Sequence, residues 1–297
     1  MAHVARAHGA GVPVNAILWT LVSVAAAVNL AGGLLTDVWP PTLLATIITL
    51  SLVVFALAHG SITYGVRGIT VFAAICLVVS NVIEQVGVVT GIPFGNYHYG
   101  DHLGPKLFMV PVLIGPAYFG IAYLAWSLAR VMLSAAGLQR AVLIFALPLV
   151  ASLVMVACNL SYDPLISTVR RGWIWRDGGA YFGVPASNFV GWFVTSYIFF
   201  QLFAFYLRKR VSDVASTGLQ LRSHWLQPIV LYGSVCAAVI LGALVSTTTG
   251  VVTDSAGVAW RIRDIYVGCA VVSALTMGSF TLLGLVTIAG AMPWRRA

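Results

Sequence analysis

The chain has 297 residues, of which 60% are hydrophobic and only 8% are charged. An ordinary soluble domain carries about a quarter charged residues, so this composition excludes a water-soluble globular protein and a disordered chain. The net charge is +8, but the 16 Lys and Arg residues stand singly or in short groups between apolar runs. That distribution is typical of the loops of a polytopic membrane protein and excludes a nucleic-acid-binding protein.

Charge-free apolar runs predict the helices in chain order. Each run is long enough for the roughly 20 residues that a membrane-spanning helix needs, although Glu84 interrupts one of them. We therefore predict an all-α, polytopic transmembrane helix bundle of about eight spans, with interfacial or re-entrant Gly/Pro/aromatic loops on one face. The predicted spans are about 14–35, 41–59, 68–90, 107–130, 141–162, 187–207, 225–247 and 265–290.

The spans form a single predicted integral membrane domain, 1–297, with a short N-terminal tail (1–13) and a short basic C-terminal tail (291–297). With about eight spans, ten of the 16 Lys and Arg residues fall on the side of the termini and six on the other. The positive-inside rule then places both termini in the cytoplasm and the protein in the cell membrane.

The connections on the opposite face carry the unusual residues. They are rich in Gly, Pro, Trp and Tyr and hold five of the eight acidic residues. Because loops on a rigid scaffold often carry function, we expect the functional residues to converge at this end of the bundle. The three connections are about 91–106, 163–186 and 248–264.

Glu84 is the only glutamate of the chain and lies inside a predicted span. An ionised carboxylate in the hydrocarbon region costs on the order of 3 kcal/mol, so such residues usually face a bundle interior and are functional by default. Asn81 and Gln85 are spaced to share a helix face with Glu84. The alternative is a hydrogen-bonded cluster that only packs helices together.

A second polar pair stands at the end of the predicted span 141–162. Asn159 and Asp163 are four residues apart and share a helix face, and Pro164 is predicted to end the helix directly after Asp163. An Asp-Pro pair is also an ordinary helix-terminating turn. The pair therefore indicates either a site or a simple helix end.

Aromatic residues crowd the connections next to these polar groups. The segment after Asp163 is too short and too rich in Gly to span the membrane, and its large aromatics exceed an ordinary interfacial belt. We predict that they line the mouth of an apolar cavity. The residues concerned are Trp173, Trp175 and Tyr181, followed by Asn188 and Trp192.

Two blocks of sequence resemble one known family. The first is Glu84-x-x-Gly87-x-x-Thr90-Gly91-x-Pro93-Phe94-Gly95-x-Tyr97-x-Tyr99, and the second runs from Asp163-Pro164 through Trp173-x-Trp175 and Tyr181-Phe182-Gly183-Val184-Pro185 to Asn188 and Trp192. They resemble the carotenoid biosynthesis membrane proteins of the γ-carotene 1',2'-hydratase and bisanhydrobacterioruberin hydratase family. Two positions depart from the family's pattern: Asn159 stands where an aspartate is frequent, and Tyr118 where a tryptophan is.

The resemblance implies water addition to the terminal ψ-end double bond of a linear carotenoid, giving a tertiary alcohol. Such a reaction needs an acid that protonates one alkene carbon, aromatic faces that stabilise the cation, and a water held ready. Glu84 and Asp163 would serve as acid and base. The predicted substrate-binding residues are Asn81, Gln85, Asn159, Tyr97, Trp173, Trp175, Tyr181, Asn188 and Trp192.

The expected partners are a hydrophobic polyene substrate, the lipid bilayer and other membrane enzymes of carotenoid biosynthesis. No metal or other cofactor is expected, because the chain has no second histidine cluster, GxGxxG motif or P-loop. Three alternatives stay open: a proton-coupled transporter that uses Glu84 as its relay, a non-catalytic carotenoid- or lipid-binding protein, and an isomerase that acts on the same polyene.

Overall fold

Long antiparallel helices make up the molecule, of which a computed structural model describes residues 12–38, 41–208 and 222–290. Within these ranges, seven helices are long and apolar enough to cross a membrane, which confirms the predicted all-α polytopic bundle. They are α1 (Val12–Leu34), α2 (Pro41–Thr90), α3 (Ile114–Ser134), α4 (Arg140–Pro164), α5 (Ala186–Arg208), α6 (Arg222–Val245) and the pair α7 (Ile262–Leu275) and α8 (Met277–Gly290), which together form one span.

Helix α2 accounts for the difference between seven long helices and about eight predicted spans. It has 50 residues, about 75 Å of straight helix, whereas the hydrocarbon core is only about 30 Å thick. Gly65 breaks it with a φ of 72°, a backbone region that favours glycine. Ile69 lies against Gly60, which a straight helix would place about 13 Å apart along its axis. The two halves therefore fold back on each other, and the first half continues past the predicted end at residue 59.

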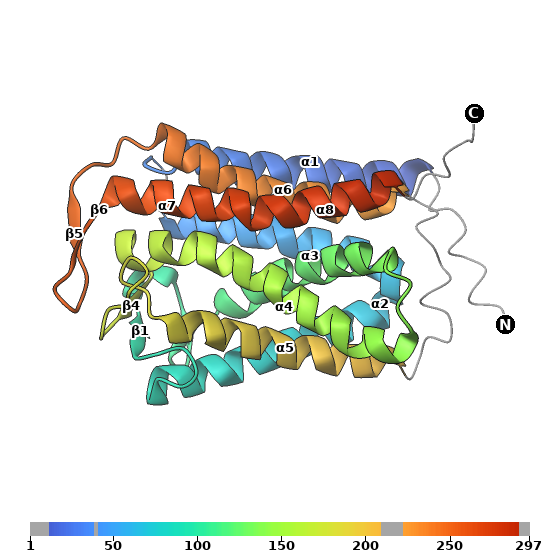
Figure 1. Cartoon of the computed structure of the whole chain (residues 1–297), viewed down its shortest axis with the longest axis horizontal. Helices are drawn as coiled ribbons and strands as arrows, with labels where there is room; N and C mark the ends of the chain where they lie inside the picture. Colours follow the sequence, from blue (N-terminus) through green and yellow to red (C-terminus); the bar gives the residue numbers. More distant parts are fainter. Residues whose placement is uncertain (1–11, 39–40, 209–221, 291–297) are drawn as a thin grey trace.

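The connections predicted to be unusual gather at one end of the bundle, at the left of Figure 1. They form three two-stranded antiparallel sheets. Helix α1 begins and α8 ends at the opposite end (Figure 1). The sheets pair β1 (Tyr97–Tyr99) with β4 (Trp173–Trp175), β2 (Lys106–Leu107) with β3 (Val110–Pro111), and β5 (Val251–Thr253) with β6 (Ala259–Arg261).

Two further predicted helix boundaries are wrong. The span predicted from residue 107 begins only at Ile114, because β2 and β3 form a hairpin that the Gln85 side chain binds through Leu107 O and Met109 N. At the end of α4, Pro164 does not stop the helix. The chain widens into one π-helical turn, Leu165–Val169, which accommodates a residue that has no backbone N–H.

The predicted tails lie almost entirely outside the described residues. Residues 1–11 and 291–297 are not described, and residues 12 and 13, assigned to the N-terminal tail, begin α1. Inside the bundle, the half remote from the sheets is filled by stacked aromatic side chains from α2, α3 and α5. The cavity that both candidate carboxyl groups line therefore lies toward the half that carries the sheets. The filling side chains include Phe72, Trp126, Phe200 and Phe203.

Close packing of α1 on α6 gives a first testable prediction. A Cβ added at Gly33 would lie 2.4 Å from the backbone oxygen of Ala238, which cannot yield as a flexible side chain would. We expect Gly33→Ala to destabilise the protein by about 1–3 kcal/mol, the usual cost of overpacking. Gly290→Ala is the matched control, because no atom of the described residues lies within 4 Å of its Cβ position. Thermal unfolding in detergent measures both, and equal midpoints would contradict the tight α1–α6 contact.

Candidate functional site

A cavity of about 280 Å³ lies in the half of the bundle that carries the sheets, and both candidate carboxyl groups line it. Glu84 is 4% exposed and Asp163 only 1%. Side chains from α1, the first half of α2 and α6 form an apolar wall, for example Leu44, Ile48 and Val239. Aromatic side chains form the wall around the carboxyl groups, namely Phe94, Tyr97, Tyr99, Tyr118, Trp173, Trp175 and Trp192.

Three tyrosine hydroxyls surround the Glu84 carboxyl group. Tyr99 donates to Oε2 over 2.7 Å, Tyr118 donates to Oε1 over 2.8 Å, and Tyr97 donates to Oε2. Burial, and after it the charge of Glu84, raises the pKa of Tyr97 and Tyr99 above the ordinary value, so both remain neutral phenols. A phenol can donate or accept a hydrogen bond. These partners therefore suit Glu84 in its ionised and in its protonated form.

Asp163 has a different set of partners, all of which donate through N–H groups. Its Oδ1 accepts from Trp173 Nε1 over 3.1 Å and from Trp175 Nε1 over 3.4 Å. Its Oδ2 accepts from Asn159 over 3.0 Å and from Asn188 over 2.7 Å. Asn188 also donates to Asn159 Oδ1 over 3.1 Å, which fixes the amide of Asn159 as a donor to Asp163. An indole N–H cannot accept a proton, so this arrangement complements an ionised carboxylate.

The sheet β1–β4 connects the two carboxyl groups. Tyr97 lies opposite Trp175 and Tyr99 opposite Trp173 in its register. Alternate residues of a strand point to the same face, so both tyrosines and both tryptophans turn to the cavity. The rings of Tyr97 and Trp175 are 5.0 Å apart. Two strands far apart in sequence thereby present one donor set to Glu84 and the other to Asp163.

The family model for carotenoid biosynthesis proteins matches residues 42–259, which include both carboxyl groups and the β1–β4 sheet. The chain belongs to the carotenoid biosynthesis protein family. This confirms the family resemblance that the two sequence blocks indicated.

A curated member with a named activity is the bisanhydrobacterioruberin hydratase of Haloarcula japonica. It is 31% identical over 137 residues, which is 44% of this chain and 45% of the relative. The match thus spans less than half the length of that curated relative. No solved structure matches this carotenoid biosynthesis protein.

Most of the predicted site residues of this carotenoid biosynthesis protein meet at the cavity, and three do not. Neither Asn81 nor Gln85 is among the described residues that line it. The Gln85 side chain binds the β2–β3 hairpin instead. Tyr181 also lies outside the lining and donates to Leu160 O of α4. Those that line the cavity are Glu84, Asp163, Tyr97, Asn159, Trp173, Trp175, Asn188 and Trp192.

Sequence reasoning missed two of the three hydroxyl groups that bind Glu84. Tyr99 stands two residues after Tyr97, so strand alternation could have placed both on one face. Tyr118 offers no such signal, because α3 brings it to Glu84 from 34 residues away. Its ring stacks on Trp192 at a centroid distance of 4.3 Å. Among the described residues, no group of three His, Cys, Asp or Glu side chains is arranged to hold a metal ion.

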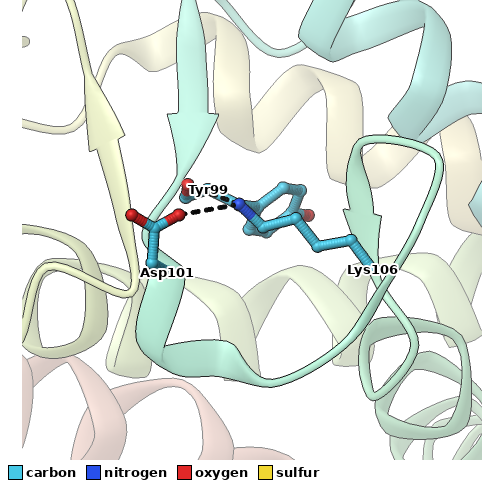
Figure 2. Close-up of polar contacts among 3 residues, drawn as sticks. All are labelled: Tyr99, Asp101 and Lys106. Carbon is cyan, nitrogen blue, oxygen red and sulfur yellow. Dashed lines mark hydrogen bonds and ion pairs between the residues drawn. The ribbon is translucent and has the colours of Figure 1, made fainter.

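Lys106 holds the loop that carries Tyr99, as Figure 2 shows. Its Nζ donates to the backbone oxygen of Tyr99 over 3.2 Å and lies 3.3 Å from Asp101 Oδ1. The Asp101 side chain is fully exposed, and exposed ion pairs contribute little because water screens them. The bond to the Tyr99 backbone is therefore the contact that positions the strand.

This difference between the two contacts of Lys106 gives a second prediction. We expect Lys106→Met to lower the activity of the protein several-fold. The variant loses the hydrogen bond from Nζ to the Tyr99 backbone, which holds the end of β1 and so the Tyr99 hydroxyl. A hydrogen bond to a charged group contributes about 1.5–3 kcal/mol. Asp101→Asn should change activity and thermal stability little. Initial rates in membranes from expressing cells measure both variants. Equal losses in the two would show that the ion pair is the important contact.

Proposed function

We propose that this protein adds water across the terminal ψ-end double bond of a linear carotenoid and releases a tertiary alcohol. The observation that carries the proposal is a pair of buried carboxyl groups, Glu84 and Asp163, that face one largely apolar cavity through different donor sets. Membership of a carotenoid biosynthesis family and the named activity of the Haloarcula relative support it.

Glu84 is the proposed proton donor. Its three tyrosine partners can accept as well as donate hydrogen bonds, so they accommodate a carboxylic acid. In the forward step, Glu84 gives its proton to the less substituted alkene carbon, and the C=C π pair forms the new C–H bond. The positive charge then lies on the tertiary carbon.

Asp163 is the proposed base. Its N–H partners favour its ionised form, and its charge would stabilise the nearby cation. The faces of Trp173, Trp175 and Trp192 add cation–π attraction, which contributes about 0.5–2 kcal/mol for each ring. A water oxygen forms the C–O bond and passes one proton to Asp163. Transfer of that proton from Asp163 to Glu84 through water restores both groups and completes the addition of one water molecule.

The substrate is proposed to reach the cavity from the bilayer, where a carotenoid dissolves. The polyene would lie along the apolar wall of α1, α2 and α6, with its end group between the carboxyl groups. In keeping with the positive-inside rule, we place the termini in the cytoplasm and the site toward the outer face of the cell membrane. Other membrane enzymes of the same pathway are the proposed partners.

Expression in a host that accumulates lycopene tests the proposal, with γ-carotene as a second substrate. The expected result is a new pigment whose mass exceeds that of the substrate by one water. Pigment that co-purifies unchanged would support the non-catalytic binding protein instead. An unhydrated isomer would support the isomerase, and proton flux into liposomes that Glu84→Gln abolishes would support the transporter.

A further inference from the structure

A second polar group lines the cavity, apart from the two carboxyl groups and their partners. It consists of Thr36 at the end of α1, Arg170 after the π-helical turn and Tyr266 in α7. Arg170 donates to Thr36 Oγ1, and Thr36 Oγ1 lies 3.5 Å from the Tyr266 hydroxyl. Three separate elements thus meet in one hydrogen-bonded row, which we call the Arg170 row.

Arg170 is unusual for a residue that lines a largely apolar cavity. A guanidinium has five N–H donors, and within the described part of the chain it has no acidic partner. The side chain is half-buried, and Arg170 stands in the connection between the π-helical turn and β4. Its remaining N–H donors therefore suit water as a partner.

The π-helical turn connects this row to the site. Asp163 lies in the last turn of α4 and Arg170 directly follows Leu165–Val169. The Ser167 hydroxyl donates to the backbone oxygen of Asp163 over 2.8 Å, which holds the turn against α4. π-Helical turns inside helices often mark functional sites. Here the turn connects Asp163 to Arg170, and both residues line the cavity.

We propose that the Arg170 row supplies and orients the water that captures the carotenoid cation, an inference that rests on the function proposed above. The walls contributed by Leu44, Ile48 and Val239 are apolar and offer water no hydrogen bonds. The row offers hydroxyl and N–H groups in the wall of the same cavity that Asp163, the proposed base, lines. Arg170, Thr36 and Tyr266 are positioning residues in this scheme and do not take part in the proton transfers.

The inference predicts how the cation divides between two fates. Water capture forms the C–O bond, and the water proton goes to Asp163. Without an ordered water, the cation loses a proton from a neighbouring carbon to the Glu84 carboxylate, and the C–H pair restores an alkene. In D₂O, Glu84 delivers deuterium to the alkene carbon. A cation that then loses hydrogen instead of deuterium returns to an alkene that carries the label, and this label is found in the recovered carotenoid. The ratio of deuterated alkene to alcohol therefore reports water supply independently of overall rate.

The experiment measures this ratio by mass spectrometry with membranes that contain the full chain in D₂O. For Arg170→Met and Thr36→Val we expect it to rise about tenfold, as for the loss of one hydrogen bond to a charged group. Arg170→Lys should restore part of the wild-type ratio, since it keeps the charge and N–H donors. Arg171→Met is the matched control, because Arg171 is exposed and is not part of the cavity lining.

A lower yield of alcohol with an unchanged ratio in both variants would overturn the inference and leave the row a purely structural contact. Thr36→Val keeps the shape of the side chain, so it still gives an answer if Arg170→Met fails to fold. Wild-type protein that yields neither alcohol nor deuterated alkene would contradict the proposed function itself, a result that is distinct from an unchanged ratio.

Discussion

Substitution of Glu84 by Gln is expected to lower the rate of water addition by about 10²–10⁴-fold, the usual contribution of a general acid. A glutamine amide has no proton acidic enough for an alkene carbon. Its NH₂ and C=O groups can still bind the three tyrosine hydroxyls, which donate and accept. We therefore expect the variant to fold and to keep its thermal stability within about 1 kcal/mol. Alcohol formation and deuterium uptake into recovered carotenoid should both fall by this factor, because both begin with the same proton transfer.

Val82→Ala is the control for Glu84→Gln, because Val82 lies two residues away and is 55% exposed on the outside of α2. It should retain wild-type rates at equal expression. If Glu84→Gln formed alcohol as fast as the wild type, the assignment of Glu84 as proton donor would be wrong. The proton would then have to come from another group at the cavity.

Asp163→Asn should combine a loss of activity with a loss of stability, unlike Glu84→Gln. Four N–H groups point at the carboxylate, and the new NH₂ group would face at least one of them without an acceptor. A buried donor left unsatisfied costs about 1–3 kcal/mol. We expect a lower thermal unfolding midpoint and a rate reduced by about two orders of magnitude or more. Since the base is lost, alcohol should fall further than deuterium uptake.

Asn188→Asp complements Asp163→Asn, because it alters a hydrogen-bond donor to Asp163 and leaves Asp163 itself unchanged. It replaces a 2.7 Å N–H···O contact with two facing carboxyl groups and should also destabilise the fold. If Asp163→Asn were as stable as the wild type, the contacts to Trp173 and Trp175 would contribute nothing. The proposed role of these indoles in keeping Asp163 ionised would then be wrong.

The sequence predicted the spans well because charge-free runs follow directly from bilayer thickness. It also singled out Glu84, because a carboxyl group inside an apolar run is conspicuous. The pairing of Tyr97 with Trp175 could not be predicted, since it joins strands 78 residues apart and depends on how α2, α3 and α4 pack. Tyr118 was missed for the same reason.

Helical spacing misled the prediction for Asn81 and Gln85. A shared face was inferred from the spacing with Glu84, but a helix in a bundle contacts different neighbours on adjacent faces. One side of α2 faces the cavity, and Gln85 contacts the β2–β3 hairpin. The prediction for Pro164 failed because the helix continues past it as a π-helical turn, which accommodates a residue without a backbone N–H and which no local rule indicates. That turn places Arg170 beside the cavity.

Under the proposed function, the size of the cavity sets the order of events for a symmetrical carotenoid. About 280 Å³ is slightly below the roughly 300–1,000 Å³ of pockets that enclose an ordinary small ligand, so one extremity of a long polyene would occupy it while the remainder stayed among lipid tails. A molecule with two reactive extremities must then dissociate, turn round and bind again. A singly hydroxylated compound should accumulate before the diol, with a lag in the diol that shortens as the ratio of enzyme to pigment rises.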